Sequence, residues 1–243
     1  MALYQTHAIL LAARDYSDAD RMVTLFSTEY GKLSAVAYGA RSARSRLAGA
    51  VQPFAHVELG LQAGKHLDTI KQCEIITSFR EIREDLTVMA YASLLAEIVM
   101  EFWPEREPQP EVFELLLAAF QLISARNPRI VALATAWHLM QLAGFEPVLE
   151  RCAVCGGEVA FPAVFSSQAG GIVCSRCHKT GQTDFSAAHK TFLEQLLGLN
   201  WENPGHFKVS SLVLAQTEKC LHEFLAYRME KPLKSLAFIQ SIG

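Results

Sequence analysis

The sequence predicts an α+β fold in which a small five-stranded barrel precedes an α-helical domain that is interrupted by four closely spaced cysteines. Up to about residue 77, apolar residues form short runs rich in β-branched and aromatic types, separated by turn residues. After Phe79 the apolar residues recur at helical spacing. Two CxxC pairs interrupt the helical region at about residues 150–180. We therefore expect one domain at 1–79 and a second at 80–243.

Five strands are expected in the first domain. Segments such as Asp15-Tyr16-Ser17-Asp18 and Tyr30-Gly31-Lys32 contain the residues that form turns between strands. Five strands in such a short segment are typical of a small barrel, and the OB-fold has that number of strands. Other small barrels and a short sandwich also fit the pattern. The predicted strands are Thr6–Ala13, Arg21–Ser27, Leu33–Tyr38, Ala55–Leu61 and Leu67–Ile75.

Helices are expected throughout the second domain. Asp85 caps the first of them, and Pro104 stops it. Asn127-Pro128 begins a central helix that is apolar on nearly all sides, a pattern that indicates burial. The other predicted helices are Glu111–Ile123, Ser186–Leu199, Ser211–Arg228 and Pro232–Gln240.

Composition restricts the class of protein. A hydrophobic fraction of 51% and a charged fraction of 19% exclude an intrinsically disordered chain. No apolar run reaches the ~18 residues of a membrane span. The first residues lack the basic and apolar regions of a signal peptide. We therefore expect a cytoplasmic protein, in which six cysteines are too sparse for a disulfide scaffold.

The net charge of −3 is unevenly distributed along the chain. Residues 1–80 and 151–243 each carry nine basic and seven acidic side chains, whereas residues 81–150 carry four basic and eleven acidic ones. An overall pI of about 6.2 excludes a uniformly basic surface but not a local basic groove. If nucleic acid binds, we expect it near the two ends of the chain rather than the acidic middle.

The spacing of four cysteines predicts a metal site. Cys152 and Cys155 form one CxxC pair, and Cys174 and Cys177 form another after eighteen intervening residues. Thiolates three positions apart on a tight turn reach one ion at ~2.3 Å, and two such turns complete a tetrahedron. Four protein ligands leave no position for a reacting water, so we expect one structural zinc ion. Two redox pairs or two disulfides are the alternatives.

The second motif with chemical meaning is residues 38–50, which we call the basic segment. Arg41, Arg44 and Arg46 alternate with small residues, and the segment contains no acidic residue. Small side chains let the backbone approach a phosphate, and each guanidinium offers a planar, two-pronged donor set. We predict phosphate binding here, with a merely solvated loop as the alternative. The candidate nucleic-acid-binding residues are Arg14, Arg21, Lys32, Arg41, Arg44, Arg46, Lys65 and Lys71.

No catalytic motif accompanies these features. The sequence contains no GxxxxGK[ST], HExxH or GxSxG motif, and no GxGxxG after a strand. Asp15, Asp18 and Asp20 lack the glycine and terminal glutamate of a calcium loop, and we expect them to form ion pairs and turn caps. His138 falls in the predicted buried helix, where we expect a hydrogen-bonded core residue. An enzyme is therefore not predicted.

Three motifs in the same order resemble bacterial RecO, a recombination mediator family. They are the segment from Gly39-Ala40-Arg41-Ser42 to Gln52-Pro53-Phe54, the paired CxxC motifs, and Lys231-Pro232-Leu233-Lys234-Ser235. The resemblance extends from about Thr6 to Phe238. It implies an N-terminal OB-fold, a helical C-terminal domain and, as in many members, a zinc finger inserted in that domain.

The same resemblance implies non-enzymatic DNA repair. Members of this family bind single- and double-stranded DNA, anneal complementary strands and contact single-strand-binding protein. Usually with RecR, they help RecA load onto coated single strands. The expected DNA contacts are then the eight basic residues named above, the expected cofactor is one zinc ion, and the expected location is the cytoplasm, at the nucleoid.

Two other functions remain open from the residues alone. A zinc-stabilised adaptor for protein partners would carry the basic segment incidentally and would capture partners without DNA affinity. A nucleic-acid-processing enzyme on the same barrel would require magnesium, and Asp15, Asp18 and Asp20 would be its first candidate ligands. A strand-annealing assay with and without salt and magnesium separates the three functions.

Overall fold

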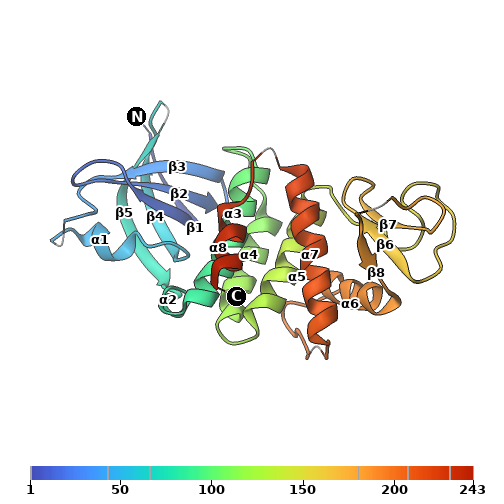
Figure 1. Cartoon of the computed structure of the whole chain (residues 1–243). Coiled ribbons are helices and arrows are strands. Elements are labelled where there is room, and N and C mark those ends of the chain that lie inside the picture. The colour runs from blue at the N-terminus through green and yellow to red at the C-terminus, as the bar shows by residue number, and fades with distance from the viewer. Residues whose placement is uncertain are drawn as a thin grey trace. The chain divides into compact units, whose positions relative to one another are not determined.

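The computed structural model describes residues 2–42, 44–65, 67–179, 181–206, 208–229 and 231–242. The chain forms two compact units, Met1–Ala132 with Phe238–Gly243, and Leu133–Ala237. Figure 1 shows the elements of both in chain order. Strands and helices are both present, as the sequence predicts. None of the helices in the described part of the chain has the length and apolar character needed to cross a bilayer.

The first unit contains a closed five-stranded barrel with the strand order β1-β2-β3-β5-β4. All neighbouring strands are antiparallel except β3 and β5, which pair in parallel at Ala35–Asp68 and Val36–Thr69. Each of the five predicted strands is present. The second has the predicted bounds, the first extends beyond both predicted ends, and the ends of the other three are displaced by one or two residues. The strands are β1 (Leu3–Asp15), β2 (Arg21–Ser27), β3 (Gly31–Ala37), β4 (His56–Gln62) and β5 (Asp68–Thr77).

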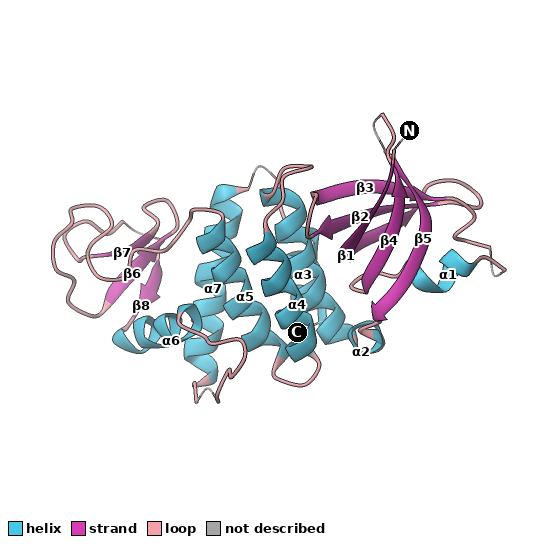
Figure 2. Cartoon of the chain, turned by 180° about the vertical axis from the view of Figure 1, so that it is seen from behind, coloured by secondary structure: helices cyan, strands magenta, loops and turns pink. Residues whose placement is uncertain are grey.

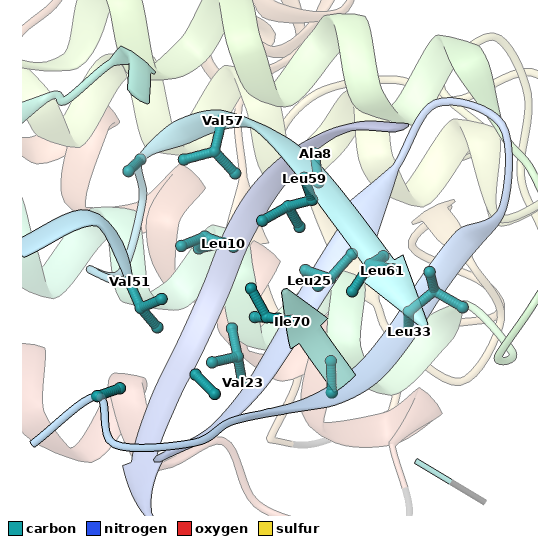
Figure 3. Packing of buried hydrophobic residues seen from close by; sticks show 14 residues of the cluster. Ala8, Leu10, Val23, Leu25, Leu33, Val51, Val57, Leu59, Leu61 and Ile70 are labelled. Carbon is teal, nitrogen blue, oxygen red and sulfur yellow. The ribbon is translucent and has the colours of Figure 1, made fainter. Parts of the chain in front are cut away.

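Aliphatic side chains fill the interior of the barrel. Figure 3 shows Leu10, Leu25, Leu59 and Leu61 pointing inward from three of the strands, and all four are fully buried. Because side chains alternate between the two faces of a strand, inward-facing residues alternate with outward-facing polar ones. This packed core makes the barrel a rigid support for groups on its outer surface.

Helices α2 (Arg80–Glu84), α3 (Leu86–Phe102) and α4 (Pro110–Ile123) belong to the same unit as the barrel. The predicted cap is confirmed, because the Asp85 carboxylate accepts the backbone N–H groups of Thr87 and Val88 at 2.8 and 3.0 Å. Phe120 of α4 packs edge-on against Phe54, with ring centroids 5.6 Å apart. Helix α2 was not predicted, since five residues show too little periodicity to be recognised.

The connector between α3 and α4 is bonded to the barrel. The carboxylate of Asp68, which is fully buried, accepts Arg106 Nη2 at 3.0 and 3.1 Å, and also the hydroxyl of Tyr4. The backbone N–H of Arg106 donates to the carbonyl of Lys32 at 2.9 Å, and Ser34 Oγ donates to Glu105 at 3.0 Å. The connector therefore covers the part of β3 that β5 does not pair.

The second unit is built around α7 (Ser211–Arg228) and the part of α5 (Pro128–Leu142) that lies within it. Trp137 is fully buried and contacts Phe224 and Phe165, with ring centroids 5.1 and 6.0 Å apart. A small sheet, ordered β7-β6-β8, lies beside α6 in Figure 2. Its strands are β6 (Ala163–Ser166), β7 (Gly171–Val173) and β8 (Thr183–Phe185), and α6 spans Ala187–Leu197. The last helix, α8 (Lys234–Ile242), begins in this unit and ends in the first.

Candidate nucleic-acid interface and metal centre

The connection between β3 and β4 folds back onto the turn between β1 and β2. The backbone N–H of Arg41 donates to the carbonyl of Ala19 at 3.0 Å, and that of Gly39 donates to Asp20 Oδ1 at 2.9 Å. Gly39 has φ +68°, a backbone conformation that other residues rarely adopt. The small residues of this segment thus allow a tight turn, which holds the basic segment against the end of the barrel (Figure 1).

The side chain of Arg41 is part of this turn. Its Nη1 donates to the carbonyl of Ser17 at 2.8 Å, and its Nη2 lies 3.2 Å from Asp15 Oδ2. Asp20 accepts the hydroxyl of Ser17 at 2.7 Å, and the hydrogen bonds from Ser17 and the Gly39 N–H lower the pKa of Asp20. Asp20 caps the turn as predicted, and Asp15 forms an ion pair, but with Arg41 rather than with the flanking Arg14 or Arg21. The role of Ser17 as an acceptor for Arg41 was not predicted, because it is the backbone carbonyl of Ser17 that accepts.

Arg14 and Arg21 lie on the two strands that enter and leave the same turn. Arg21 is paired with Asp15 in the β1–β2 ladder, and Arg14 is one position further from the turn. The Arg14 side chain is exposed, whereas Arg21 is partly buried and donates to the carbonyl of Val51 at 3.4 Å. Both arginines therefore lie at the end of the barrel that carries the basic segment.

Arg44 and Arg46 are exposed in the β3–β4 connection. Arg46 begins α1 (Arg46–Ala50), a short helix whose N-cap is Ser45, with Oγ accepting the N–H of Leu47 at 3.2 Å. Leu47 packs against the barrel core. We expected a loop here, but tertiary packing of Leu47 and Ala50 orders one helical turn that has no sequence periodicity. The structure thus brings five of the eight predicted basic residues to one end of the barrel.

The three predicted lysines lie elsewhere. Lys32, on β3, donates its ammonium to the carbonyl of Met100 at the end of α3, and burial lowers its pKa. The structure thus places Lys32 between barrel and helix, away from the arginines. Lys65 is exposed in the β4–β5 connection, and Lys71 is exposed on β5.

The four predicted cysteines meet in the second unit. Their four sulfur atoms all lie within 4.8 Å of one another, and the sulfurs of Cys155 and Cys174 are 3.9 Å apart. Each pair sits on a tight turn, closed by the N–H of Gly156 donating to the carbonyl of Cys152 at 2.8 Å and by that of Cys177 donating to Cys174 at 3.0 Å. The cluster is compatible with one zinc ion.

Backbone donors surround the sulfur of Cys152. Burial would raise the pKa of this thiol, but N–H groups that include that of Cys174, 3.4 Å away, outweigh burial and lower the pKa to about 6. The pKa of Cys177 is raised to about 12, because hydrogen bonds and the charges of Cys155 and Cys174 favour its protonated form. Packing four sulfurs together therefore disfavours four negative charges unless a cation lies among them.

His138 is hydrogen-bonded as predicted, but it is half-buried rather than part of the core. Its Nε2 lies 2.9 Å from the carbonyl of Leu197, and its Nδ1 accepts the indole N–H of Trp201 at 2.9 Å. Since the indole only donates, Nε2 carries the proton and donates to Leu197. Burial lowers the pKa of His138. Both ring nitrogens are occupied, so the residue holds the segment after α6 in place.

Comparison with known proteins agrees with this architecture. The family model described as "Recombination protein O N terminal" matches residues 1–79, which contain the barrel. The model described as "Recombination protein O C terminal" matches residues 83–237, which contain the cysteine cluster. Together they account for nearly the whole chain.

Curated relatives match the chain from end to end. A protein of Pelotomaculum thermopropionicum named "DNA repair protein RecO" is 37% identical over 245 residues, covering 100% of this chain and 96% of the relative. Proteins of the same name from Symbiobacterium thermophilum and Desulforamulus reducens are 35% and 34% identical, over 100% of this chain and 98% and 96% of theirs. The chain therefore belongs to the RecO family of DNA repair proteins.

Proposed function

We propose that this protein is a recombination mediator that binds single- and double-stranded DNA and anneals complementary strands. The observation that carries the proposal is the cluster of Arg14, Arg21, Arg41, Arg44 and Arg46 at one end of the barrel. Asp15, Asp18 and Asp20 lie at the same end, so the five positive charges of the arginines exceed the three negative charges there. Membership of the RecO family supports a role in DNA repair.

We infer that the barrel is an OB-fold, and the support is the strand count, the closed order β1-β2-β3-β5-β4, and the helix α1 between β3 and β4. We also infer that residues 1–79 and 80–243 are two domains, because separate family models match 1–79 and 83–237, and α2–α4 of the second then pack in the same compact unit as the barrel. OB-folds bind nucleic acids with a barrel face and its adjoining loops. The basic segment lies in the β3–β4 connection and is hydrogen-bonded to the β1–β2 turn, which is one of these loops.

The inferred mechanism is electrostatic bridging. Exposed arginines neutralise phosphates and release counterions, so two strands approach each other without their sequence being read. Annealing is energetically downhill once the strands meet, and therefore needs neither nucleotide hydrolysis nor a catalytic residue. Tyr16 and Tyr38, with 52% and 58% of their surfaces exposed, lie next to the arginines in sequence and are suited to stacking on unpaired bases.

The cysteine cluster is proposed to hold one structural zinc ion. Tetrahedral zinc with bonds of about 2.3 Å separates its sulfurs by about 3.8 Å, and the Cys155–Cys174 distance of 3.9 Å matches this value. Four thiolates complete the coordination, so Cys152, Cys155, Cys174 and Cys177 would fasten two turns together rather than activate water. The expected contribution of the ion is to the folding of this unit.

The proposed partners follow from the family resemblance. They are RecR, single-strand-binding protein and, indirectly, RecA, with the protein acting in the cytoplasm at the nucleoid. Binding to DNA is the property to establish first, because each of these partners acts on DNA that is already coated or being coated.

The decisive experiment compares the wild-type protein with R41A/R44A/R46A in DNA binding and strand annealing over a range of salt concentrations. If four to six phosphates are contacted, log affinity falls against log salt with a slope of about −3 to −5 in the wild type. Losing three contacts should reduce that slope by about 2–3 and slow annealing. The control R80A/K219A/K231A removes the same charge from exposed sites outside the cluster and should leave both properties unchanged.

Wild-type affinity in the arginine variant, or binding that does not respond to salt, would contradict the proposal. DNA cleavage that depends on magnesium would indicate the enzyme alternative. Partner capture with no DNA affinity would indicate the adaptor.

A further inference from the structure

The barrel carries a hollow of about 730 Å³ on its outer surface, lined by none of the five clustered arginines. It lies over β1, β4 and β5, of which β4 and β5 face the viewer in Figure 2. This volume is in the range of small-molecule sites, about 300–1,000 Å³. The side chains used in the argument below are Leu3, Gln5, Gly60, Gln62, Lys71 and Gln72.

The hollow exists because Gly60, in the middle of it, has no side chain. Gln5 on β1 is paired with Gly60 on β4, and Gly60 is paired in turn with Gln72 on β5. Directly opposite residues project from the same face of a sheet, so this row has an amide at each end and a gap in the middle. A Cβ placed on Gly60 would lie 3.3 Å from both Cβ and Oε1 of Gln72, which shows how closely the flanking amide borders the gap.

A β-bulge turns Lys71 toward the same hollow. Gly60 pairs with Gln72 whereas Leu61 pairs with Ile70, so Lys71 is the extra residue on β5. A bulge lets two successive residues share one face of a strand. Lys71 and Gln72 are accordingly both exposed, and both line the hollow.

The hollow is positively charged and rich in amides. Among the described residues that line it, Lys71 is the one charged side chain. Carboxylates appear only in the next row of the same face, where His7, Glu58 and Glu74 pair across the strands. An anionic group is therefore favoured at the Lys71 side and disfavoured at the opposite side. Glutamine amides both donate and accept hydrogen bonds, so they suit the edge of any nucleobase.

The strand register connects this hollow to the basic segment. β3 and β5 run in parallel, with Val36 opposite Thr69. Tyr38 and Lys71 each follow two residues later, so the chain leaves β3 at Tyr38 close to the level of Lys71. Tyr38 is 58% exposed and is the first residue of the basic segment. A single strand held by the arginines can thus continue past Tyr38 into the hollow.

We propose that this hollow seats one unpaired base of a bound single strand, between Gln5 and Gln72, with Lys71 on the adjoining phosphate. The inference rests on the proposed DNA-binding function and adds a distinction to it. Arginines at the barrel end bind any phosphate backbone, whereas the hollow accepts only a base that is not paired. It therefore gives the protein a preference for single strands that are still to be annealed.

The test compares three DNA probes of equal phosphate number: a single strand, the same strand with every base removed, and a duplex. Gly60→Thr fills the gap with a residue that favours strands, and Lys71→Gln removes the charge while keeping a polar side chain. Lys219→Ala, an exposed change on α7, is the matched loss of one positive charge. Thermal unfolding of each variant shows whether the fold is kept, and Lys71→Gln tests the site if Gly60→Thr does not fold.

We expect Gly60→Thr to weaken binding of the base-containing single strand about tenfold, the size of one seated base, and to leave the abasic strand and the duplex unchanged. Lys71→Gln should reduce the salt slope for single strands by about 0.7, the value for one phosphate, whereas Lys219→Ala should not. Equal effects of Gly60→Thr on all three probes, or none on any, would overturn the base site. A wild-type protein that binds none of the probes would instead refute the proposed function.

Discussion

Replacing Asp15 by asparagine is expected to strengthen DNA binding, because Asp15 competes with phosphate for Arg41. In the structure Arg41 Nη2 lies 3.2 Å from Asp15 Oδ2, and the two side chains are 37% and 62% exposed. A phosphate that binds Arg41 must displace this carboxylate or share the guanidinium with it. Asparagine keeps the size of the side chain and removes its charge.

The structure sets the size of the effect. Coulomb's law in bulk water gives about 1.3 kcal/mol for unit charges at this separation, and measured exposed ion pairs contribute about 0.2–1 kcal/mol. Removing the pair should therefore raise DNA affinity by up to about fivefold, since 1.4 kcal/mol corresponds to tenfold. The free energy of unfolding should fall by no more than about 1 kcal/mol.

The assay is fluorescence anisotropy of a labelled single strand and a labelled duplex at low and moderate salt. Asp18→Asn is the matched control, since Asp18 is an exposed aspartate of the same turn and has no ion pair with Arg41. Asp15→Asn should exceed Asp18→Asn in affinity, and the difference should disappear in an Arg41→Ala background. Equal gains from the two aspartates would show that only net charge matters, and weaker binding by Asp15→Asn would refute the reasoning.

Three further predictions concern stability. Cys174→Ser should reduce the zinc content, measured by elemental analysis, below the expected one ion per chain. It should also lower the unfolding temperature, because metal binding is coupled to folding. Asp68→Ala should lower the free energy of unfolding in denaturant by about 1–3 kcal/mol, since it removes the acceptor of the Tyr4 hydroxyl and of Arg106, which is half-exposed and can still be hydrated. Burial would raise the pKa of Asp68, but its hydrogen bonds outweigh burial and lower it, so its stabilising effect is complete above about pH 4 and is lost on further acidification. Burial lowers the pKa of His138, so stability should also decline as pH falls below about 6.5, because the unfolded chain then binds a proton that the folded chain excludes.

Each of these has a result that would contradict it. Full metal content in Cys174→Ser would exclude the four-thiolate site. An unchanged unfolding free energy in Asp68→Ala would show that the connector is not held by this carboxylate. A stability profile that is the same for wild type and His138→Gln between pH 5 and pH 7 (the interval around the ordinary histidine pKa of about 6.5) would assign that decline to another group.

Elements with strong local signals were predicted closely. The sequence predicts a strand at Arg21–Ser27 and a helix at Ser211–Arg228, and β2 and α7 have those bounds in the structure. Asp85 and Asn127 cap helices as expected, the latter by accepting the N–H of Arg129 at 3.0 Å. Helix caps and hydrophobic periodicity involve residues only a few positions apart, so a short stretch of sequence is enough to predict these elements.

Short elements that depend on distant contacts were missed. α1, α2 and β8 contain five, five and three residues, too few for a periodic pattern. β8 forms only because β6 offers an open edge for pairing, with Ala163 opposite Phe185. The pairing partner lies about twenty residues away along the chain, where local patterns carry no information about it.

Two groups of reactive side chains can be recognised in the sequence: four thiols at zinc-binding spacing, and a basic segment with small residues and no acidic one. Residue type and spacing are properties of the chain, so they need no coordinates. Which charges act together follows instead from how the chain folds. The fold brings five arginines to one end of the barrel, pairs Arg41 with Asp15, and turns Lys32 toward the carbonyl of Met100. Charges interact through space and are weakened by distance and solvent, and strand pairing, which sets those distances, involves residues far apart in the sequence.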